Sequence, residues 1–258
     1  MKTEFCAPYS ALAEIYDQVM SHVDYAAWAG YLAYLIGTHA PVKPSILELG
    51  CGTGNLTVNL VPRLEGSYLA SDRSPEMLTV ARERLSVLPH VGLELLDFRD
   101  LNHENQYDVV LLACDGINYA RTTEELGCIL AGVAKIVRPG GLFMFDQSTP
   151  ANSINNLSYF DDEFVGDGIS YSRTSSYDEQ TRVHVTRFSI AKGESILIES
   201  HEQRAFTRME LLESARSARF KVVAMLAAFG PEPADDETER IQWVLRSPSS
   251  TDIGPKHD

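Results

Sequence analysis

The chain has 258 residues, of which 44% are hydrophobic, so it can bury a sizeable core as one large domain or a medium domain with an insertion. Acidic residues outnumber basic ones by 36 to 22, and the net charge of −14 repels polyphosphate chains, which argues against DNA or RNA as a partner. The four cysteines, Cys6, Cys51, Cys114 and Cys128, form no CxxC pair, so neither a metal site nor a disulfide framework is expected.

The first predicted elements are two helices between Ser10 and Gly37, broken near residues 22–24, because apolar side chains recur there at helical spacing. From Ser45 to Asp146, apolar runs alternate with helical patterns. This alternation predicts a parallel sheet covered by helices on both faces.

Cap signals mark several helix ends within this region. Ser74 and Pro75 predict the start of one helix, and Thr122 with Glu125 predicts a capping box at the start of another. The sequence Pro-Gly-Gly at 139–141 predicts the end of that second helix.

Residues 159–206 have a different pattern, with segments rich in Tyr, Thr, Val and Ile and no helical period. YSRTSSY, RVHVTRFSI and SILIESHEQRAF predict antiparallel strands, with turns at 178–179 and 192–194. The α/β pattern resumes at a capping box of Thr207 and Glu210 and ends in the strands FKVVAMLAAF and RIQWVLR.

These elements predict an α/β fold, Rossmann-like, with helices on both faces of the sheet and an inserted antiparallel β cap. We expect N-terminal helices at 1–43 and a Rossmann-like domain formed by 44–150 and 207–246. We expect the cap at 151–206 and a flexible tail at 247–258.

A glycine-rich turn, ELGCGTGN, follows the first strand of the α/β region. Its glycines allow a tight turn and close approach of a ligand to the backbone, and the next helix offers free amides at its N-terminus. A dinucleotide-binding fingerprint would need its last glycine where Asn55 stands. An acidic residue, Glu48, two positions before Gly50 is a different pattern, and it resembles the first motif of the class I methyltransferases that use S-adenosylmethionine (SAM).

Further residues match that family in order and spacing. Asp72 ends the second strand, where a carboxylate can accept hydrogen bonds from ribose hydroxyls, which implies a nucleoside ligand. Asp97 and Phe98 end the third strand, and in the family such a pair contacts the adenine. The stretch CDGINY at 114–119 and RPGG at 138–141 match the later motifs.

The resemblance extends over roughly residues 9 to 246 and is closest to small-molecule methyltransferases with an antiparallel β cap. These are similar to nucleotide-sugar N,N-dimethyltransferases and to bacterial methyltransferases of unassigned substrate. It implies that SAM is the cofactor, that the cap covers the acceptor pocket and that Tyr16 contacts the methionine end of SAM. The residues expected to bind the cofactor are Tyr16, Trp28, Glu48, Gly50, Gly52, Asn55, Asp72, Arg73, Met77, Asp97, Phe98 and Cys114.

One residue departs from the family pattern. A Gly-Phe pair usually precedes the penultimate strand, whereas this chain has Ala218, Arg219 and Phe220. We expect a small change in how the helix ends and none in function.

The sulfonium of SAM is already a strong electrophile, so the protein mainly has to align the acceptor and exclude water. An acceptor that carries a proton also needs a base, and the candidates are Tyr119, His201 and Glu199. A hydrogen-bonded structural role is the alternative for His201, and strand alternation places it on the face opposite Arg204. Arg204 either anchors an acidic acceptor, and then counts among the catalytic candidates, or pairs with a surface acid.

Packing against the sheet explains Tyr16 and Trp28 as readily as ligand contact does, and Cys51 and Cys114 are interpreted as packing residues. The main hypothesis is a methyltransferase acting on nitrogen or oxygen of a small molecule. A protein or peptide methyltransferase, another SAM-using transferase and a non-catalytic SAM-binding regulator are the alternatives.

We expect no nucleic acid or membrane partner, and a homodimer stays open. The N-terminus lacks a basic segment followed by an apolar run, and no stretch reaches 18 uncharged apolar residues. The expected location is therefore the cytoplasm.

Overall fold

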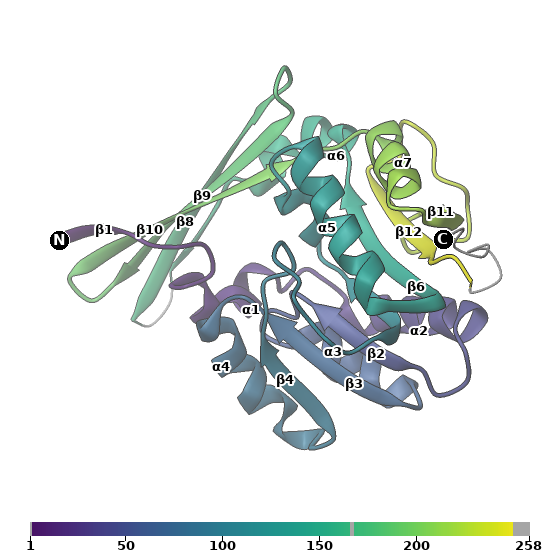
Figure 1. Cartoon of the computed structure of the whole chain (residues 1–258). Helices are drawn as coiled ribbons and strands as arrows, with labels where there is room; N and C mark the ends of the chain where they lie inside the picture. Colours follow the sequence, from purple (N-terminus) through teal and green to yellow (C-terminus); the bar gives the residue numbers. More distant parts are fainter. Residues whose placement is uncertain (1, 166–167, 250–258) are drawn as a thin grey trace.

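The computed structural model describes residues 2–165 and 168–249, and within them it contains two β-sheets (Figure 1). The larger sheet has the strand order β11-β12-β6-β5-β2-β3-β4. Strands β2 to β6 run parallel, while β12 and β11 are antiparallel at one edge. Its strands are β2 (Ser45–Leu49), β3 (Ser67–Asp72), β4 (Val91–Leu95), β5 (Tyr107–Leu112), β6 (Val137–Ser148), β11 (Lys221–Ala227) and β12 (Arg240–Arg246).

Helices cover both faces of this sheet, which confirms the predicted fold class (Figure 1). Helices α2 (Tyr25–His39), α3 (Asn55–Leu60) and α4 (Pro75–Arg84) share a buried hydrophobic cluster with one face. Helices α5 (Thr123–Ile136) and α7 (Arg208–Ser217) share another with the opposite face. Neighbouring residues of β2 point to opposite faces, because Ile46 belongs to the first cluster and Leu47 to the second.

Two of the predicted helix starts have the expected caps. The Ser74 side chain accepts the Met77 N–H at the start of α4. Thr207 and Glu210 form a complete capping box at the start of α7.

Helix α5 differs from the prediction at both ends. Thr122 accepts from the N–H of Glu125, but the Glu125 side chain accepts from Arg121, one residue before the position that a capping box uses. The helix ends at Ile136, and residues 138–141 lie inside strand β6, where the pairing with β5 shifts register. The Pro-Gly-Gly segment therefore forms a local irregularity in a strand and does not end the helix.

The smaller sheet, called the cap sheet here, projects to one side of the molecule and has the order β1-β10-β9-β8-β7 (Figure 1). Its strands are β1 (Lys2–Phe5), β7 (Asp162–Val165), β8 (Ile169–Asp178), β9 (Val183–Lys192) and β10 (Ser195–Arg204). The short helix α6 (Pro150–Asn155) and a 3₁₀ turn, η5 (Leu157–Phe160), connect β6 to this sheet.

Strand β1 is a structural feature that the sequence analysis did not predict. It pairs in parallel with β10, so the chain's first residues belong to the cap sheet. All four of its residues are exposed, and Phe5 is 84% exposed. The strand therefore has no buried alternating face by which sequence patterning could have identified it.

The N-terminal helical region lies between the two sheets in sequence and in space. It consists of a 3₁₀ turn, η1 (Leu12–Glu14), the short helix α1 (Tyr16–Val19) and then α2, so the predicted break near residues 22–24 is present. Leu12 and Val19 pack against the cap residues Phe188 and Ile190. This packing joins the N-terminal segment to the cap.

Three other 3₁₀ turns complete the chain: η2 (Val61–Arg63), η3 (Leu85–Val87) and η4 (Gly116–Tyr119). Ser247 and Pro248 form backbone hydrogen bonds with Gly141 and Gly140. Residues 250–258 of the predicted tail lie outside the described part of the chain.

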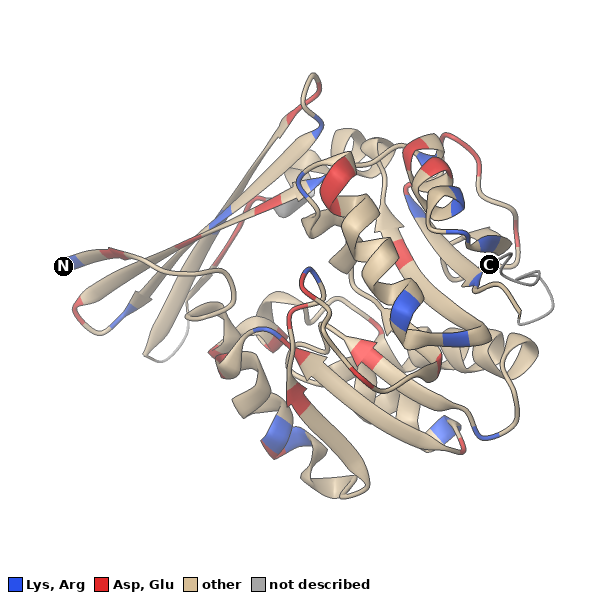
Figure 2. Ribbon diagram, viewed as in Figure 1, with Lys and Arg blue, Asp and Glu red and all other residues tan. Residues whose placement is uncertain are grey.

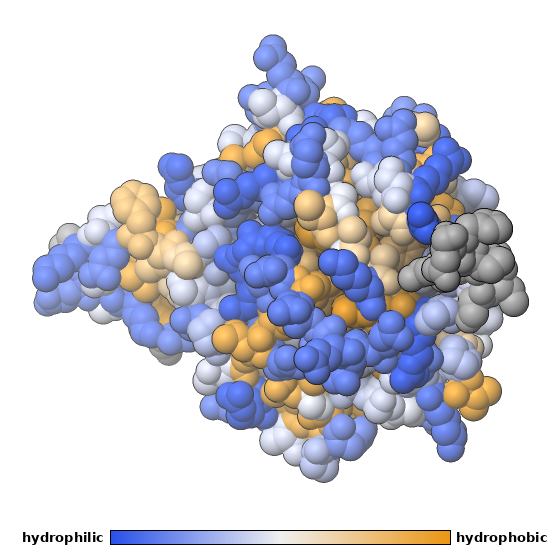
Figure 3. Space-filling model, viewed as in Figure 1, coloured by the Kyte–Doolittle hydropathy of each residue, from blue (hydrophilic) through white to orange (hydrophobic). Residues whose placement is uncertain are grey.

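Acidic side chains occur on both sheets and on the helices that flank the larger one (Figure 2). The face shown in Figure 3 is largely hydrophilic, with hydrophobic side chains gathered on the cap and near the middle of the view. None of the helices in the described residues is long and apolar enough to span a membrane.

Candidate functional site

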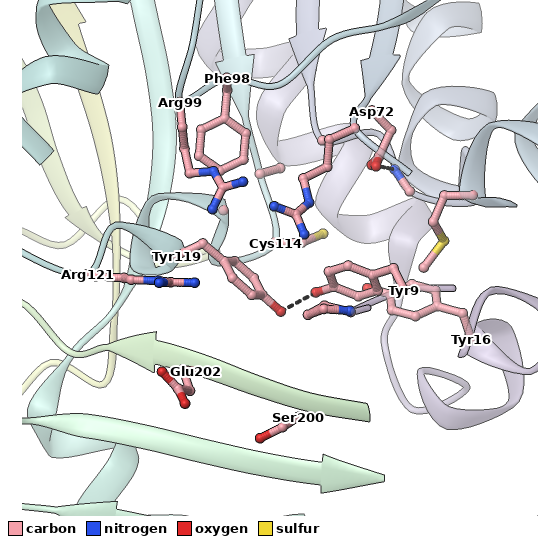
Figure 4. Close-up of a pocket in the computed structure, with 17 residues that line it drawn as sticks. Tyr9, Tyr16, Asp72, Phe98, Arg99, Cys114, Tyr119, Arg121, Ser200 and Glu202 are labelled. Carbon is pink, nitrogen blue, oxygen red and sulfur yellow. Dashed lines mark hydrogen bonds between the residues drawn. The ribbon is translucent and has the colours of Figure 1, made fainter. Parts of the chain in front are cut away.

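A first cavity of about 370 Å³ opens at the carboxyl ends of β2, β3 and β5, where parallel α/β sheets place their ligand sites (Figure 4). Tyr9, Arg99, Arg121, Ser200 and Glu202 line it although they were not among the predicted site residues. The predicted site residues that line it are Tyr16, Gly50, Gly52, Asp72, Arg73, Met77, Phe98, Cys114 and Tyr119.

The Asp72 carboxylate is the main fixed acceptor in this cavity. It is 7% exposed, and it accepts the Gly52 N–H at Oδ2 (2.8 Å) and the Ser74 N–H at Oδ1 (2.9 Å). Burial raises the pKa of Asp72, and these backbone donors partly oppose that rise. Gly50 and Gly52 have φ values of +66° and +57°, which favour glycine at both positions. The glycine turn and the carboxylate thus hold each other in place.

Four predicted cofactor residues lie outside the wall of the first cavity. Trp28 belongs to the second cavity described below, and the other three have hydrogen-bond partners within the protein. Glu48 accepts hydrogen bonds from the hydroxyls of Thr57 (2.6 Å) and Tyr68 (2.9 Å). Burial raises the pKa of Glu48 to about 7 in spite of these two hydrogen bonds. The Glu48 carboxyl group is thus occupied by partners within the protein, and its predicted contact with the cofactor stays a prediction.

The other two are Asn55 and Asp97. The Asn55 amide donates to Asp17 (2.7 Å), and Asp97 forms two hydrogen bonds with the Arg99 guanidinium (3.1 and 2.6 Å). The first tethers α1 to the glycine turn, and the second leaves Arg99, rather than Asp97, at the cavity wall. Neither side chain lines the first cavity, and the predicted contacts of both with the cofactor stay predictions.

A second cavity, of about 560 Å³, lies between the N-terminal helices, the cap sheet and β12. Trp28 lines this cavity and not the first, so its predicted contact with the cofactor is not supported. The Trp28 ring packs edge-on against Phe229 (5.2 Å between centroids) and lies beneath the Arg240 guanidinium (5.8 Å). Other aromatic residues in the wall are Tyr9, Tyr16, Tyr119 and Phe188.

The charged groups of the second cavity are largely neutralised within the protein. Arg240 forms ion pairs with Asp115 and with the buried Asp146, and Arg173 forms a two-point pair with Asp162 (2.8 Å). Burial is the main cause that raises the pKa of Asp146 to about 7. The cavity wall therefore combines several aromatic rings with charged groups that are largely paired within the protein.

The two cavities share a wall made of Tyr9, Tyr16, Cys114 and Tyr119. The hydroxyls of Tyr9 and Tyr119 are 2.5 Å apart, and the Tyr119 hydroxyl is 3.0 Å from Nδ1 of His201. Nε2 of His201 is in turn 3.2 Å from the Glu199 carboxylate. A continuous hydrogen-bonded path thus leads from the shared wall into the cap.

Strand β10 positions the last two members of that path by simple alternation. Glu199 and His201 are buried on one face, 0% and 4% exposed, while Ser200 and Glu202 reach the first cavity from the other. Arg204 lies outside both cavities. It pairs with Glu210 (3.3 Å), donates to a backbone carbonyl and covers the Phe206 ring, so its predicted catalytic role is not supported.

Cys114 lines the first cavity and Cys51 lies within the glycine turn, and burial raises the thiol pKa of both well above the ordinary value. Neither is poised as a thiolate nucleophile. Within the described residues, no group of three or more His, Cys, Asp or Glu side chains is placed to hold a metal ion.

Two functional candidates escaped sequence reasoning for different reasons. Tyr9 carries no motif, and its partners Tyr119 and Glu199 lie 110 and 190 positions away. Arg99 adjoins the Asp97-Phe98 pair and could have been found by its place at the strand end.

Comparison with known proteins gives a consistent result. The model of a protein family described as a methyltransferase domain matches residues 46–141. YqeM of Bacillus subtilis (strain 168) is 27% identical over 248 residues, which cover 90% of this chain and 94% of that one. The dTDP-3-amino-3,4,6-trideoxy-alpha-D-glucopyranose N,N-dimethyltransferase of Streptomyces venezuelae is 32% identical over 136 residues, covering 52% and 56%.

The fold is also that of a solved structure. The crystal structure of an S-adenosylmethionine-dependent methyltransferase from Clostridium acetobutylicum ATCC 824 superposes with a TM-score of 0.77 at 23% identity. The superposition covers 93% of this chain and 99% of that one, so the likeness includes the cap sheet as well as the larger sheet.

Proposed function

The chain belongs to the class I SAM-dependent methyltransferases, and from that premise we propose that it methylates a nitrogen or oxygen of a small molecule held in the second cavity. The observation that carries this proposal is the shared wall. A ligand in the first cavity and one in the second would face each other across Tyr9, Tyr16, Cys114 and Tyr119.

The residues of the first cavity fit SAM in volume and in chemistry. A cavity of about 370 Å³ is within the range of small-ligand sites. Asp72 offers a buried carboxylate to the ribose hydroxyls, and Phe98 offers an aromatic face beside the adenine. The positive-φ glycines leave the backbone free of side chains where the ligand would approach, since no atom lies within 4 Å of a Cβ built at Gly52.

When bound, SAM supplies a methyl group on a sulfonium, whose carbon–sulfur electron pair returns to sulfur as the bond from carbon to the acceptor forms. The protein's own contribution is to hold the acceptor in line and exclude water. The aromatic rings of the second cavity would pack against the acceptor, and the Arg240–Asp115 ion pair leaves fewer unpaired charges in its wall. The amino-sugar acceptor in the name of the Streptomyces relative supports a small molecule.

The test combines binding with turnover. Calorimetric titration should give micromolar affinity for SAM and S-adenosylhomocysteine and no binding of NADH. Formation of S-adenosylhomocysteine should then be followed with a dTDP-amino sugar, the corresponding hydroxyl sugar and a short peptide with a free N-terminus. Turnover of either sugar supports the proposal, whereas turnover of the peptide alone would contradict it and favour a peptide methyltransferase.

A further inference from the structure

Tyr9 lies in the wall between the two cavities and is fixed at three points. Its N–H donates to Glu199 (2.8 Å), its carbonyl accepts from the Ser74 hydroxyl (3.1 Å) and its hydroxyl bonds to that of Tyr119 (2.5 Å). Its φ of +69° is in the left-handed region, which a tyrosine keeps only when its surroundings enforce it. Contacts from both the cap sheet and the larger domain thus fix Tyr9, and its backbone is strained as a result.

The hydrogen-bonded path through Tyr119 has a direction that Glu199 sets. Burial raises the Glu199 pKa, but hydrogen bonds from His201 and from backbone N–H groups of the N-terminal segment outweigh burial and hold that pKa below its ordinary value. An ionised carboxylate only accepts, so His201 carries a proton on Nε2, and in the neutral ring Nδ1 is then an acceptor. The Tyr119 hydroxyl then donates to His201, and its oxygen accepts the hydroxyl proton of Tyr9.

This polarity leaves the Tyr9 oxygen as the open end of the path. Its own proton points to Tyr119, so its lone pairs are free to accept from a group in either cavity. We propose that Tyr9 takes the proton of the methyl acceptor and that Tyr119 relays it to His201, with Glu199 as the counter-ion. This rests on the proposed function, since it presumes an acceptor in the second cavity.

The proton transfers balance without any further reagent. The acceptor proton moves to the Tyr9 oxygen as the acceptor atom bonds to the methyl carbon. The Tyr9 proton moves to the Tyr119 oxygen, and the Tyr119 proton moves to Nδ1 of His201. Both tyrosines end neutral, and His201 becomes an imidazolium paired with Glu199. Burial raises the pKa of both phenols well above its ordinary value, so they relay protons and do not rest as phenolates.

Other titratable groups surround the path, but none of them takes the role of Glu199 as the partner of His201. Asp72 and Tyr16 lie near Tyr9, and Arg73 and Asp115 lie near Tyr119. Among these, Asp115 is already paired with Arg240. Glu199 is the carboxylate that hydrogen-bonds His201 directly.

The first test is Tyr9→Phe, which keeps the ring and removes the hydroxyl. We expect kcat to fall by about 10² to 10³, the typical contribution of acid–base catalysis, while KM and the affinity for S-adenosylhomocysteine stay within about threefold. Tyr34→Phe is the matched control, because Tyr34 is 68% exposed and lines neither cavity. An unchanged kcat in Tyr9→Phe would overturn the proposal.

The second test needs no acceptor. Nitrogen-15 NMR of histidine-labelled protein should show His201 protonated on Nε2 in the wild type. Glu199→Gln offers an amide donor at that position and should move the proton to Nδ1, whereas Glu194→Gln in the exposed β9–β10 turn should not. A wild-type His201 protonated on Nδ1, whether alone or together with Nε2, would leave no acceptor for the Tyr119 proton and would refute the relay. Failure to bind S-adenosylhomocysteine would instead contradict the proposed function, because the NMR result is independent of the cofactor.

Discussion

Replacing Glu48 by glutamine should remove a pH dependence of stability that this buried carboxyl group imposes. Glu48 is 2% exposed, and burial raises its pKa from 4.5 to about 7. Between these values the unfolded chain has lost the proton and the folded chain keeps it. The stabilisation is therefore complete below pH 4.5 and is lost as the pH rises to about 7. A pKa rise of about 2.5 corresponds to about 3 kcal/mol.

Urea unfolding at pH 5 and pH 8 measures this contribution. From pH 5 to pH 8 the wild type should lose about 2–3 kcal/mol of unfolding free energy relative to Glu48→Gln, because glutamine does not titrate. Any fixed cost of placing the amide beside Thr57 and Tyr68 cancels in this comparison, as do other titrating groups. Glu83→Gln on the exposed side of α4 is the control and should follow the wild type. Parallel stability profiles for wild type and Glu48→Gln would refute the reasoning.

Three further substitutions test individual side chains. Asp72→Asn turns an acceptor oxygen into a donor that faces the Gly52 N–H, and calorimetry should show about 10- to 100-fold weaker S-adenosylhomocysteine binding by a protein with unchanged circular dichroism. Equal affinity would remove Asp72 from the site. Arg219→Gly relieves a φ of +65° and should raise the free energy of unfolding by about 1 kcal/mol, which thermal melts would register as a Tm higher by about 2–4 °C. A lower Tm would contradict this. Arg204→Gln breaks the pair with Glu210 and should cost up to about 1 kcal/mol while kcat stays within twofold. A tenfold loss of kcat would return Arg204 to the catalytic residues.

The features that could be predicted from sequence are those whose causes lie within a few residues of one another. The capping box of Thr207 and Glu210 is complete in the structure, and Gly50 and Gly52 have the positive φ that a tight turn requires. The replacement of the family's glycine by Arg219 was also visible in the local sequence. Arg219 keeps the left-handed conformation that glycine favours, so the helix end retains its shape under strain.

Motif spacing does not set the direction in which the side chain of a predicted site residue points. Glu48 belongs to the glycine motif, yet its carboxyl group turns toward Thr57 and Tyr68, away from the cavity. Arg204 ends a strand of the cap, but Glu210 on the following helix pairs with its guanidinium. Such choices depend on partners that only the folded chain brings together.

The attachment of the N-terminal segment to Glu199 also has a consequence for biosynthesis. Tyr9 is translated 190 positions before its carboxylate partner. A loop of that length must close before the ring is held, and such distant contacts form slowly. The larger sheet from β2 to β6 can therefore assemble during translation with its ligand cleft unfinished. The segment around Tyr9 is then made before the sheet that it borders but reaches its place after it, and newly synthesised molecules become active only once β10 has emerged.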